Sequence, residues 1–200
     1  MSNKYSTLII LDWDDTLFPT SWLVKNNLNI NDINVRVKYK PYFDKLDKII
    51  YNFIRKLSKY GKVIIVTNAM PVWVKMSSNV LPNTKRLLEH IRILSARKLY
   101  QYKYDMPKWK TYVFRDEISR EIKNNKILNI ISIGDAEYEY KALVNLYNFN
   151  RKKKKILKSI KLMKNPSDRI LIDQLEILDN VAINFCKTDK HLDLVFKSAF

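Results

Sequence analysis

The sequence predicts an α/β protein, a three-layer α/β/α Rossmann-like arrangement in which helices cover both faces of a parallel sheet. Two observations predict it. Short apolar runs typical of buried strands recur along the chain, and segments with helical periodicity separate them. In addition, no linker rich in proline, glycine or serine divides the 200 residues. This length suits one domain with a full core, so we expect a single domain over residues 1–200.

In the first half of the chain, a helix is expected over 41–60, because apolar residues recur on one of its faces. Gly61 stands where a helix C-cap is common. The segment 18–40 is polar and rich in Asn, which predicts an irregular loop. The other elements expected in this half are strands at 7–12, 62–67 and 91–95 and short helices at 72–76 and 82–90.

In the second half, a helix is expected from Pro107, because proline is favoured at the first helical position. Ser167 predicts the N-cap of a long amphipathic helix that ends near Lys187. Cys186 falls in that helix and is expected to be a small buried apolar side chain. The other elements expected are strands at 127–135 and 156–163, a helix at 137–147 and an edge strand at 192–196.

Carboxylates follow the first expected strand directly. Four apolar residues at 8–11 lead into Asp12, Asp14 and Asp15, and burying such a strand end is costly unless something compensates the negative charge. A divalent cation with a phosphate ester would do so, because hard cations prefer carboxylate oxygens. Side chains two residues apart leave a strand on the same side, so Asp12 and Asp14 can face one site while Trp13 points away.

Two further strands are expected to end in polar side chains. The strand at 62–67 ends in Thr67 and is followed by Asn68. The strand at 127–135 ends in Gly134 and Asp135, and this glycine is one of only two in the chain. Parallel sheets bind ligands beyond the carboxyl ends of their strands. Glycine is favoured where the backbone must pass close to a ligand or turn sharply, and Gly134 stands at such a strand end.

Several lysines stand between the strands expected at 62–67 and 127–135. They are Lys98, Lys103, Lys108 and Lys110. Lys108 and Lys110 lie in the first turn of the helix expected from Pro107, near the carboxyl ends of the strands.

These segments resemble the four motifs of the haloacid dehalogenase superfamily, over about Leu8 to Phe149. Asp12-x-Asp14-x-Thr16 resembles the first motif, Thr67 with Asn68 the second, and Gly134-Asp135 the fourth. Pro107-Lys108-Trp109-Lys110 with Phe114 resembles a Pro-x-Trp-Lys-x-x-x-Phe pattern of the superfamily, which points to Lys110 as the motif III lysine. The stretches 66–69, 73–74 and 95–97 look like a poorly characterised eukaryotic and viral branch that brings no known substrate.

The resemblance implies a magnesium-dependent phosphatase that hydrolyses phosphate monoesters through an aspartyl-phosphate. Aspartate at position 14 favours a phosphatase or phosphotransferase over the dehalogenase and pump branches. The implied catalytic residues are Asp12 as nucleophile, Asp14 as general acid and base, and Thr67 and Lys110 as ligands of the phosphoryl oxygens. The substrate-binding residues expected beside them are Thr16, Asn68 and Lys164.

The expected cofactor is Mg²⁺. The resemblance implies that it is held by the Asp12 carboxylate, the Asp14 backbone carbonyl, Asp135 and Glu139. Glu139 stands where relatives often carry aspartate, so Glu137 is an alternative to it. The gaps between the motifs have little room for an inserted domain, which predicts a minimal cap or none. Relatives without a cap often act on large substrates or use a partner subunit as the lid.

The composition bears on partners and location. Lys and Arg number 37 against 20 Asp and Glu, which gives a formal charge of +17. Such a charge attracts polyanions. A lysine bias that follows from the base composition of the genome, together with solubility, explains the charge equally well. The run from Arg151 to Lys155 precedes the strand expected at 156–163, which places it at the edge of the sheet away from the acids, whereas Lys164 follows that strand. Two alternatives therefore stay open, a polynucleotide end phosphatase and a catalytically silent, basic nucleic-acid-binding module on the same fold.

The remaining expectations concern the compartment. A single cysteine excludes an internal disulfide and fits a reducing compartment. No long apolar span and no N-terminal signal pattern stand in the sequence, so we expect no membrane association and a cytoplasmic location, in a host cell if the chain is viral.

Overall fold

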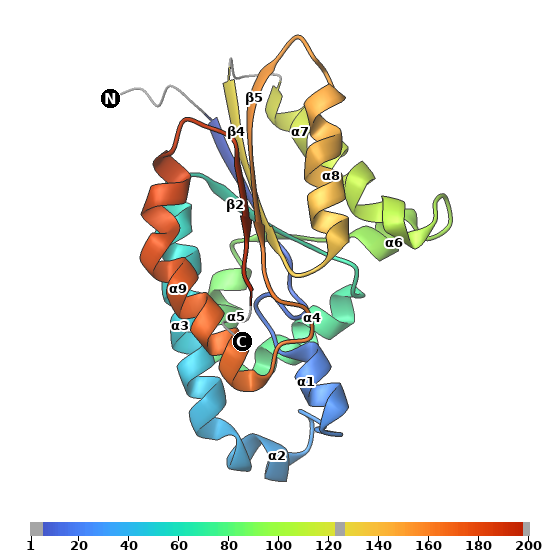
Figure 1. Cartoon of the computed structure of the whole chain (residues 1–200). Coiled ribbons are helices and arrows are strands. Elements are labelled where there is room, and N and C mark those ends of the chain that lie inside the picture. The colour runs from blue at the N-terminus through green and yellow to red at the C-terminus, as the bar shows by residue number, and fades with distance from the viewer. Residues whose placement is uncertain (1–5, 123–126, 198–200) are drawn as a thin grey trace.

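The computed structural model describes residues 6–122 and 127–197 (Figure 1). The strands are β1 (Ser6–Leu11), β2 (Lys62–Thr67), β3 (Arg92–Ser95), β4 (Ile127–Gly134), β5 (Lys154–Lys161) and β6 (Leu192–Val195). The α-helices are α1 (Thr20–Lys25), α2 (Ile33–Lys38), α3 (Lys40–Ser58), α4 (Pro71–Ser77), α5 (Pro82–Leu88), α6 (Ala96–Tyr100), α7 (Trp109–Ile122), α8 (Glu137–Asn148) and α9 (Asp168–Lys187). Two short 3₁₀ helices also occur in the described residues, η1 (Ser78–Val80) between α4 and α5 and η2 (Met106–Lys108) before α7.

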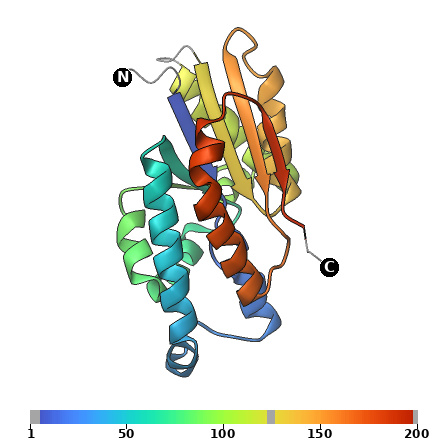
Figure 2. The same cartoon turned by 60° about the vertical axis from the view of Figure 1, so that its left-hand side comes forward.

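The six strands form one sheet in the order β3-β2-β1-β4-β5-β6, and every neighbouring pair is parallel. Helices α3 and α9 pack side by side on one face, and α7 and α8 cover the other (Figures 1 and 2). This is the three-layer Rossmann-like arrangement that the sequence predicts. The inner strands β1, β2 and β4 are covered on both faces, which explains why they are largely apolar runs.

The side chains of β1 show how the sheet separates two cores. Ile9 and Leu11 belong to the core shared with α3 and α9, whereas Leu8 and Ile10 belong to the core shared with α7 and α8. This alternation follows from the two-residue period of a strand. Its next even-numbered side chain, Asp12, therefore emerges on the α7 and α8 side.

The strand order also decides where ligands can reach. The chain leaves β1 toward β2 and β3 on one side, and then returns to β4 on the other side of β1. A crevice opens at such a reversal, beyond the carboxyl ends of the strands, and open α/β sheets bind ligands there. In this chain, that position is flanked by the residues that follow β1, β2 and β4.

One sequence-based expectation is wrong in the segment 18–40, which is not an irregular loop. It contains the six-residue helices α1 and α2. Leu23 anchors α1 in the core, and the Asp32 carboxylate caps α2 by accepting a hydrogen bond of 2.8 Å from the backbone N–H of Asn34. Helices this short carry too few apolar positions to show a 3.6-residue period, so the periodicity could not reveal them.

Two smaller expectations also need correction. β5 begins at Lys154, so the basic run enters the strand instead of preceding it, because the exposed start of a strand needs backbone pairing but no apolar side chain. Gly61 is not a left-handed helix cap, since no described glycine has a positive φ. A Cβ at Gly61 would lie 2.5 Å from the Thr7 carbonyl oxygen, so glycine is needed there for space.

Other expectations are confirmed. Ser167 caps α9 by accepting a hydrogen bond of 3.2 Å from the Ile170 N–H, Cys186 is buried within that helix, and β6 forms an edge strand. None of the helices in the described residues combines the length and the apolar character that a membrane crossing requires.

Candidate active site

Asp12 occupies the first position after β1 and is almost fully buried. Its backbone N–H donates a hydrogen bond of 3.0 Å to the Ile133 carbonyl, so the pairing with β4 continues through this residue. The neighbouring Trp13 points the other way, into the core shared with α3, and its indole N–H donates to the Ser77 hydroxyl at 2.9 Å. The strand geometry thus aims the Asp12 carboxylate toward α7 and α8.

Lys110 reaches Asp12 from the first turn of α7. Only 2 % of it is exposed, and its Nζ lies 2.8 Å from Asp12 Oδ1, within ion-pair distance but outside hydrogen-bond geometry. The same ammonium forms a hydrogen-bonded ion pair with Glu139. The competing lysines, Lys98, Lys103 and Lys108, are exposed. Of the four candidate lysines, the structure therefore places Lys110 among the acids.

Glu139 enters the site from the first turn of α8. Its Oε2 accepts a hydrogen bond of 3.0 Å from the Ala136 N–H, which fixes the side chain against the start of the helix. Its Cγ packs on Gly134, where an added Cβ would come within 2.5 Å. Glu137 instead lies outside the group: it pairs with Lys161, and that hydrogen bond lowers the pKa of its exposed carboxyl. Of the two alternatives, the structure brings Glu139 to the site.

The carboxylates of Asp12, Asp135 and Glu139 form an acidic cluster, with oxygen atoms that lie within 4.8 Å of one another. Together with the Lys110 ammonium, three ionised carboxylates leave two negative charges in excess. Such a buried excess is costly unless protons or a cation compensate it.

The pKa directions agree with that charge balance. Burial raises the pKa of Asp12 well above its ordinary value, and the Lys110 ammonium offsets this only in part. Burial, with a contribution from the Glu139 carboxylate, raises the pKa of Asp135 to about 7. For Lys110, burial by itself would lower the pKa, but the Asp12 and Glu139 carboxylates outweigh it and the net pKa is raised. A divalent cation fits this all-carboxylate cluster in both charge and donor type.

Asp14 lies outside the acidic cluster and is held by three donors. Its Oδ1 accepts hydrogen bonds from the Trp73 indole N–H at 2.7 Å and from the Thr20 hydroxyl at 2.5 Å. Its Oδ2 accepts one from the Thr67 hydroxyl at 3.1 Å. Thr67 is fully buried and accepts a hydrogen bond of 2.9 Å from the Ala69 N–H, so its own orientation is fixed. The carboxylate of Asp14 is therefore positioned beside the cluster without belonging to it.

Asp15 links this site to the loop before α9. Its backbone is left-handed, with φ of 54°, a conformation that aspartate tolerates better than most residues. Its carboxylate accepts hydrogen bonds from the Ser21 N–H, at 2.8 Å, and from the Ser21 hydroxyl. Burial raises the pKa of Asp15, against the effect of these hydrogen bonds. Ser21 Oγ also lies 3.1 Å from Asn165 Oδ1, which joins α1 to that loop.

A cavity of about 840 Å³ opens next to these two aspartates, between α1 and the loop before α9. Thr20 and Ser21 line it and also hold Asp14 and Asp15, so the cavity adjoins the acids directly. Its other lining side chains are mixed in character: Trp22, Val24, Lys25, Asn26, Asn165, Pro166, Ser167 and Ile170.

The three expected substrate-binding residues, Thr16, Asn68 and Lys164, differ in burial and in their partners. Thr16 is fully buried, and its hydroxyl has no hydrogen-bond partner among the described residues. The buried Oδ1 of Asn68 also lacks a partner there. Lys164 is exposed three residues beyond β5, on the same edge of the sheet as the site, but no ion pair joins it to the described acids of the cluster.

Three residues at the site escaped the sequence-based reasoning: Trp73, Thr20 and Ser21. Trp73 stands in a stretch that the resemblance includes, but its indole nitrogen carries no signal that it binds Asp14. Thr20 and Ser21 lie in the segment expected to be irregular, so nothing predicted that α1 would bring two hydroxyl groups to the acids.

Comparison with protein-family models, with curated proteins and with solved structures found no match. A functional proposal therefore rests on the residues and their geometry.

Proposed function

We propose that this protein is a magnesium-dependent phosphatase of the haloacid dehalogenase type, which hydrolyses phosphate monoesters through an aspartyl-phosphate on Asp12. One observation carries the proposal. Asp12, Asp135 and Glu139 form a buried acidic cluster around Lys110, beyond the carboxyl ends of β1 and β4, and Asp14 is held in a fixed orientation beside it.

In the first step, an Asp12 carboxylate oxygen attacks phosphorus. The bond between phosphorus and the leaving oxygen breaks, and protonated Asp14 gives its proton to that oxygen. The two residues have separate roles because Asp12 belongs to the acidic cluster, whereas three neutral donors hold Asp14 outside it. Splitting the hydrolysis into two displacements replaces one difficult step with two easier ones.

In the second step, water attacks the phosphorus of the aspartyl-phosphate. Asp14 now takes the proton of that water, and inorganic phosphate leaves with the Asp12 carboxylate restored. General acid and base catalysis by one positioned carboxyl contributes roughly 10²–10⁴-fold to the rate.

Lys110 and Thr67 would hold the oxygens of the transferring phosphoryl group. The Lys110 ammonium already lies at ion-pair distance from the nucleophile, so it can bind an oxygen of the group that Asp12 attacks. The Thr67 hydroxyl now donates to Asp14, and rotation about its C–O bond would turn this donor to the substrate. The cavity lined by Thr20 and Ser21 suits the leaving group, because the leaving oxygen must come within reach of Asp14.

Asp12, Asp135 and Glu139 would hold Mg²⁺, with the Asp14 backbone carbonyl as the further ligand that the resemblance implies. When bound, the ion neutralises phosphate charge and orients the group for displacement. A polynucleotide end phosphatase gains no support at this site, because the described basic run lies at the opposite edge of the sheet.

The test is turnover of an aryl phosphate with Mg²⁺. Asp12→Asn removes the nucleophile and should abolish turnover, whereas Asp44→Asn makes the same change at an exposed aspartate on α3 and should leave it unchanged. Acid quenching followed by mass spectrometry should find a phosphoryl group on Asp12 in the wild type. Turnover near the wild-type rate in a folded Asp12→Asn protein would exclude this mechanism.

A further inference from the structure

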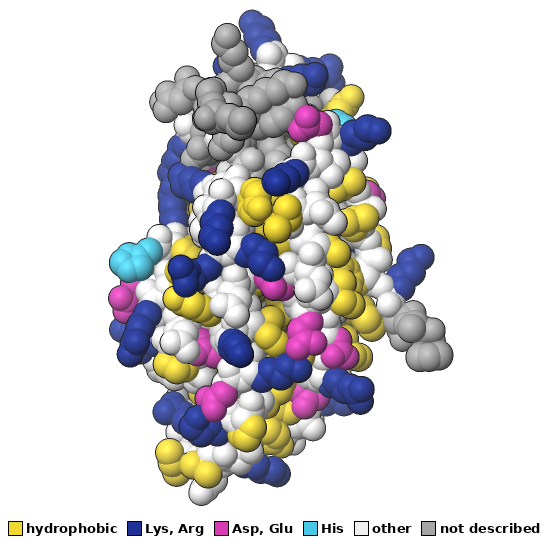
Figure 3. All heavy atoms as spheres, turned by 90° about the vertical axis from the view of Figure 1, so that its left-hand side faces the viewer, with side chains coloured by type: hydrophobic (Ala, Val, Ile, Leu, Met, Phe, Trp, Pro, Cys, Tyr) yellow, Lys and Arg dark blue, Asp and Glu magenta, His cyan; other side chains and the backbone are white. Residues whose placement is uncertain are grey.

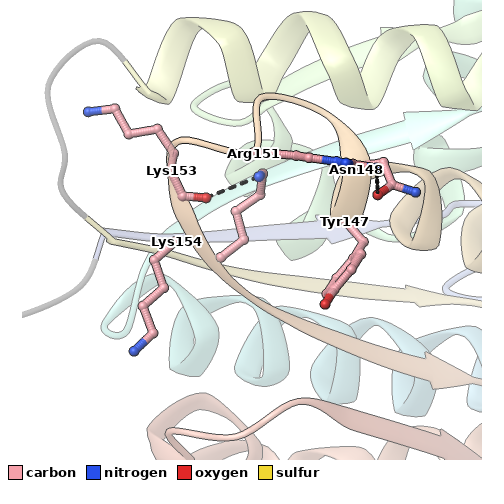
Figure 4. A pocket seen from close by; sticks show the side chains of 6 residues that line it. Tyr147, Asn148, Arg151, Lys153 and Lys154 are labelled. Carbon is pink, nitrogen blue, oxygen red and sulfur yellow. Dashed lines mark hydrogen bonds between the residues drawn. The ribbon is translucent and has the colours of Figure 1, made fainter.

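A second cavity lies at the edge of the sheet opposite the acidic cluster, and we call it the basic hollow. It encloses about 540 Å³ at the loop between α8 and β5, where Figure 4 shows its side chains. The residues that line it are Tyr147, Asn148, Arg151, Lys153, Lys154 and Lys155.

The basic hollow is separated from the candidate active site by the length of the sheet. β5 runs parallel to β4, and β4 runs parallel to β1, so all three strands start at the same edge. Lys154 is the first residue of β5, whereas Asp12 follows the last residue of β1. A ligand in the basic hollow therefore does not occupy the phosphatase site, and the inference below stands independently of the proposed function.

The charge of the basic hollow is concentrated and of one sign. Among the residues that the structure describes, no carboxylate lines it, and no ion pair involves Arg151, Lys154 or Lys155. The loop itself holds two of the cations in place. Lys155 Nζ donates to the Asn150 and Lys153 carbonyls at 3.0 and 3.1 Å, and Arg151 Nη2 donates to Asn148 Oδ1 at 2.8 Å.

The face covered by α3 and α9 shows how different this arrangement is. There, lysines and arginines alternate with acids, as Figure 3 shows. Lys45 pairs with Glu176 at 2.9 Å and Lys56 pairs with Asp179 at 2.7 Å. Cations on that face are thus paired with acids, whereas Arg151, Lys154 and Lys155 have no carboxylate partner among the described residues. Burial also lowers the pKa of Lys155, which a bound anion would reverse.

An aromatic side chain stands beside these cations. Tyr147, in the last turn of α8, is 67 % exposed, and its ring centroid lies 6.4 Å from that of His191. Such an exposed ring offers a surface on which a nucleobase can stack, and neighbouring cations bind the phosphates of the same strand. Neither an acidic peptide nor an anionic vesicle has a base to stack, so both would use the cations alone.

We infer that the basic hollow binds single-stranded nucleic acid, with Arg151, Lys154 and Lys155 on the phosphates and Tyr147 against a base. A single strand fits better than a duplex because its bases are free to stack on a side chain.

The test is fluorescence anisotropy with labelled oligouridylate and oligothymidylate of about 12 nucleotides, a length within the usual site sizes. Replacing Arg151, Lys154 and Lys155 together by Gln should weaken binding at least ~10-fold and reduce the slope of log affinity against log salt by about 2, at roughly 0.7 per lost phosphate contact. Turnover of an aryl phosphate should stay unchanged in the same variant.

The matched control removes the same charge elsewhere. Lys48 on α3, Lys59 just after it and Lys98 on α6 are exposed, so their joint replacement by Gln lowers the net charge equally. Equal weakening in this control would assign binding to total charge and overturn the inference. Because Lys155 also holds the loop, Lys154→Gln serves as a second variant that removes no hydrogen bond among the described residues, and it should still weaken binding about 2- to 5-fold.

Tyr147 distinguishes nucleic acid from other polyanions. Tyr147→Ala should weaken oligonucleotide binding roughly 5- to 150-fold without changing the salt dependence, whereas Tyr147→Phe should bind as the wild type does. Binding of inorganic polyphosphate or of phosphatidylserine vesicles should not depend on Tyr147. If Tyr147→Ala binds oligonucleotides as well as the wild type does, the ligand is recognised by charge alone and the inference is wrong.

Discussion

Among the residues that the structure describes, two lysines are almost completely buried, and they differ in what surrounds them. Lys110, on α7, is 2 % exposed and lies among the carboxylates of Asp12 and Glu139. Lys158, within β5, is 0 % exposed, and its ammonium donates to the Phe185 and Cys186 carbonyls at 2.7 and 3.3 Å. The pKa of Lys110 is raised because the carboxylates outweigh the effect of burial, whereas burial lowers the pKa of Lys158.

The difference teaches that burial of a charge does not by itself mark a functional site. Lys158 meets carbonyl groups in the last turn of α9, where a helix leaves acceptors without partners and where its dipole favours a cation. Its role is therefore structural. Lys110 belongs to a group whose carboxylates outnumber it, so the excess negative charge must be compensated by protons or by a cation. The excess charge, and not the buried lysine, indicates chemistry.

The largest effect is expected from removing Lys110. Lys110→Ala should lower kcat for an aryl phosphate by roughly 10²- to 10³-fold, the usual cost of one oxyanion donor. Lys108→Ala, two residues earlier on an exposed side chain, is the matched control and should change kcat less than about 2-fold. A loss confined to Lys108→Ala would mean that Lys108, in the 3₁₀ turn before α7, contacts the substrate and that the comparison of buried lysines is mistaken.

Removing Lys158 should act on stability instead. Lys158→Met keeps an unbranched side chain that is one atom shorter, and it leaves the Phe185 and Cys186 carbonyls without their donor, which should reduce the free energy of unfolding by about 1–3 kcal/mol. Urea denaturation measures this change. The kcat of the folded variant should match that of the wild type, and a kcat that falls as in Lys110→Ala would contradict the structural role.

The excess charge around Lys110 predicts how stability depends on pH. Asp135 has a pKa of about 7 in the folded protein, against 3.8 ordinarily. At a pH between these two values, the folded protein keeps a proton on Asp135 that the unfolded chain has released. This stabilisation is present below about pH 4 and is lost as the pH rises to about 7. In EDTA, Tm should therefore fall by several degrees over that range, beyond the change seen in Asp135→Asn.

Measuring Tm with added Mg²⁺ tests the proposed metal site. At pH 8, Mg²⁺ should raise the Tm of the wild type, because a ligand that binds only the folded state stabilises it. Asp135→Asn should lose this response, since it removes a ligand of the proposed site. An equal rise in both proteins would show that the cation binds elsewhere.

The smallest effect is expected at a neutral donor. Trp73→Phe removes the indole hydrogen bond to Asp14 but leaves the Thr67 and Thr20 hydrogen bonds in place. One such hydrogen bond contributes about 0.5–1.5 kcal/mol, so kcat/KM should fall by roughly 2- to 12-fold. An unchanged kcat/KM in the folded variant would leave Trp73 as a packing residue.

Much of the fold and part of the site follow from local sequence patterns. Apolar runs mark β1, β2 and β4 because a strand in a parallel sheet is buried on both faces, and Asp12, Thr67 and Asp135 can be found as the polar residues where these runs end. Helices α1 and α2 could not be found in this way, because six residues are too few for a period to show.

The choice between similar residues belonged to the tertiary structure. Lys108 and Lys110 share one helical turn in the sequence, and Glu137 and Glu139 share another, so neither propensity nor spacing separates them. The packing of α7 and α8 on the sheet buries Lys110 and Glu139 and leaves Lys108 exposed and Glu137 paired with Lys161. The sequence by itself determined which strands carry acids to one edge. Only long-range packing decided which charges meet there, because the free energy of a buried charge depends on partners that lie far away in the chain.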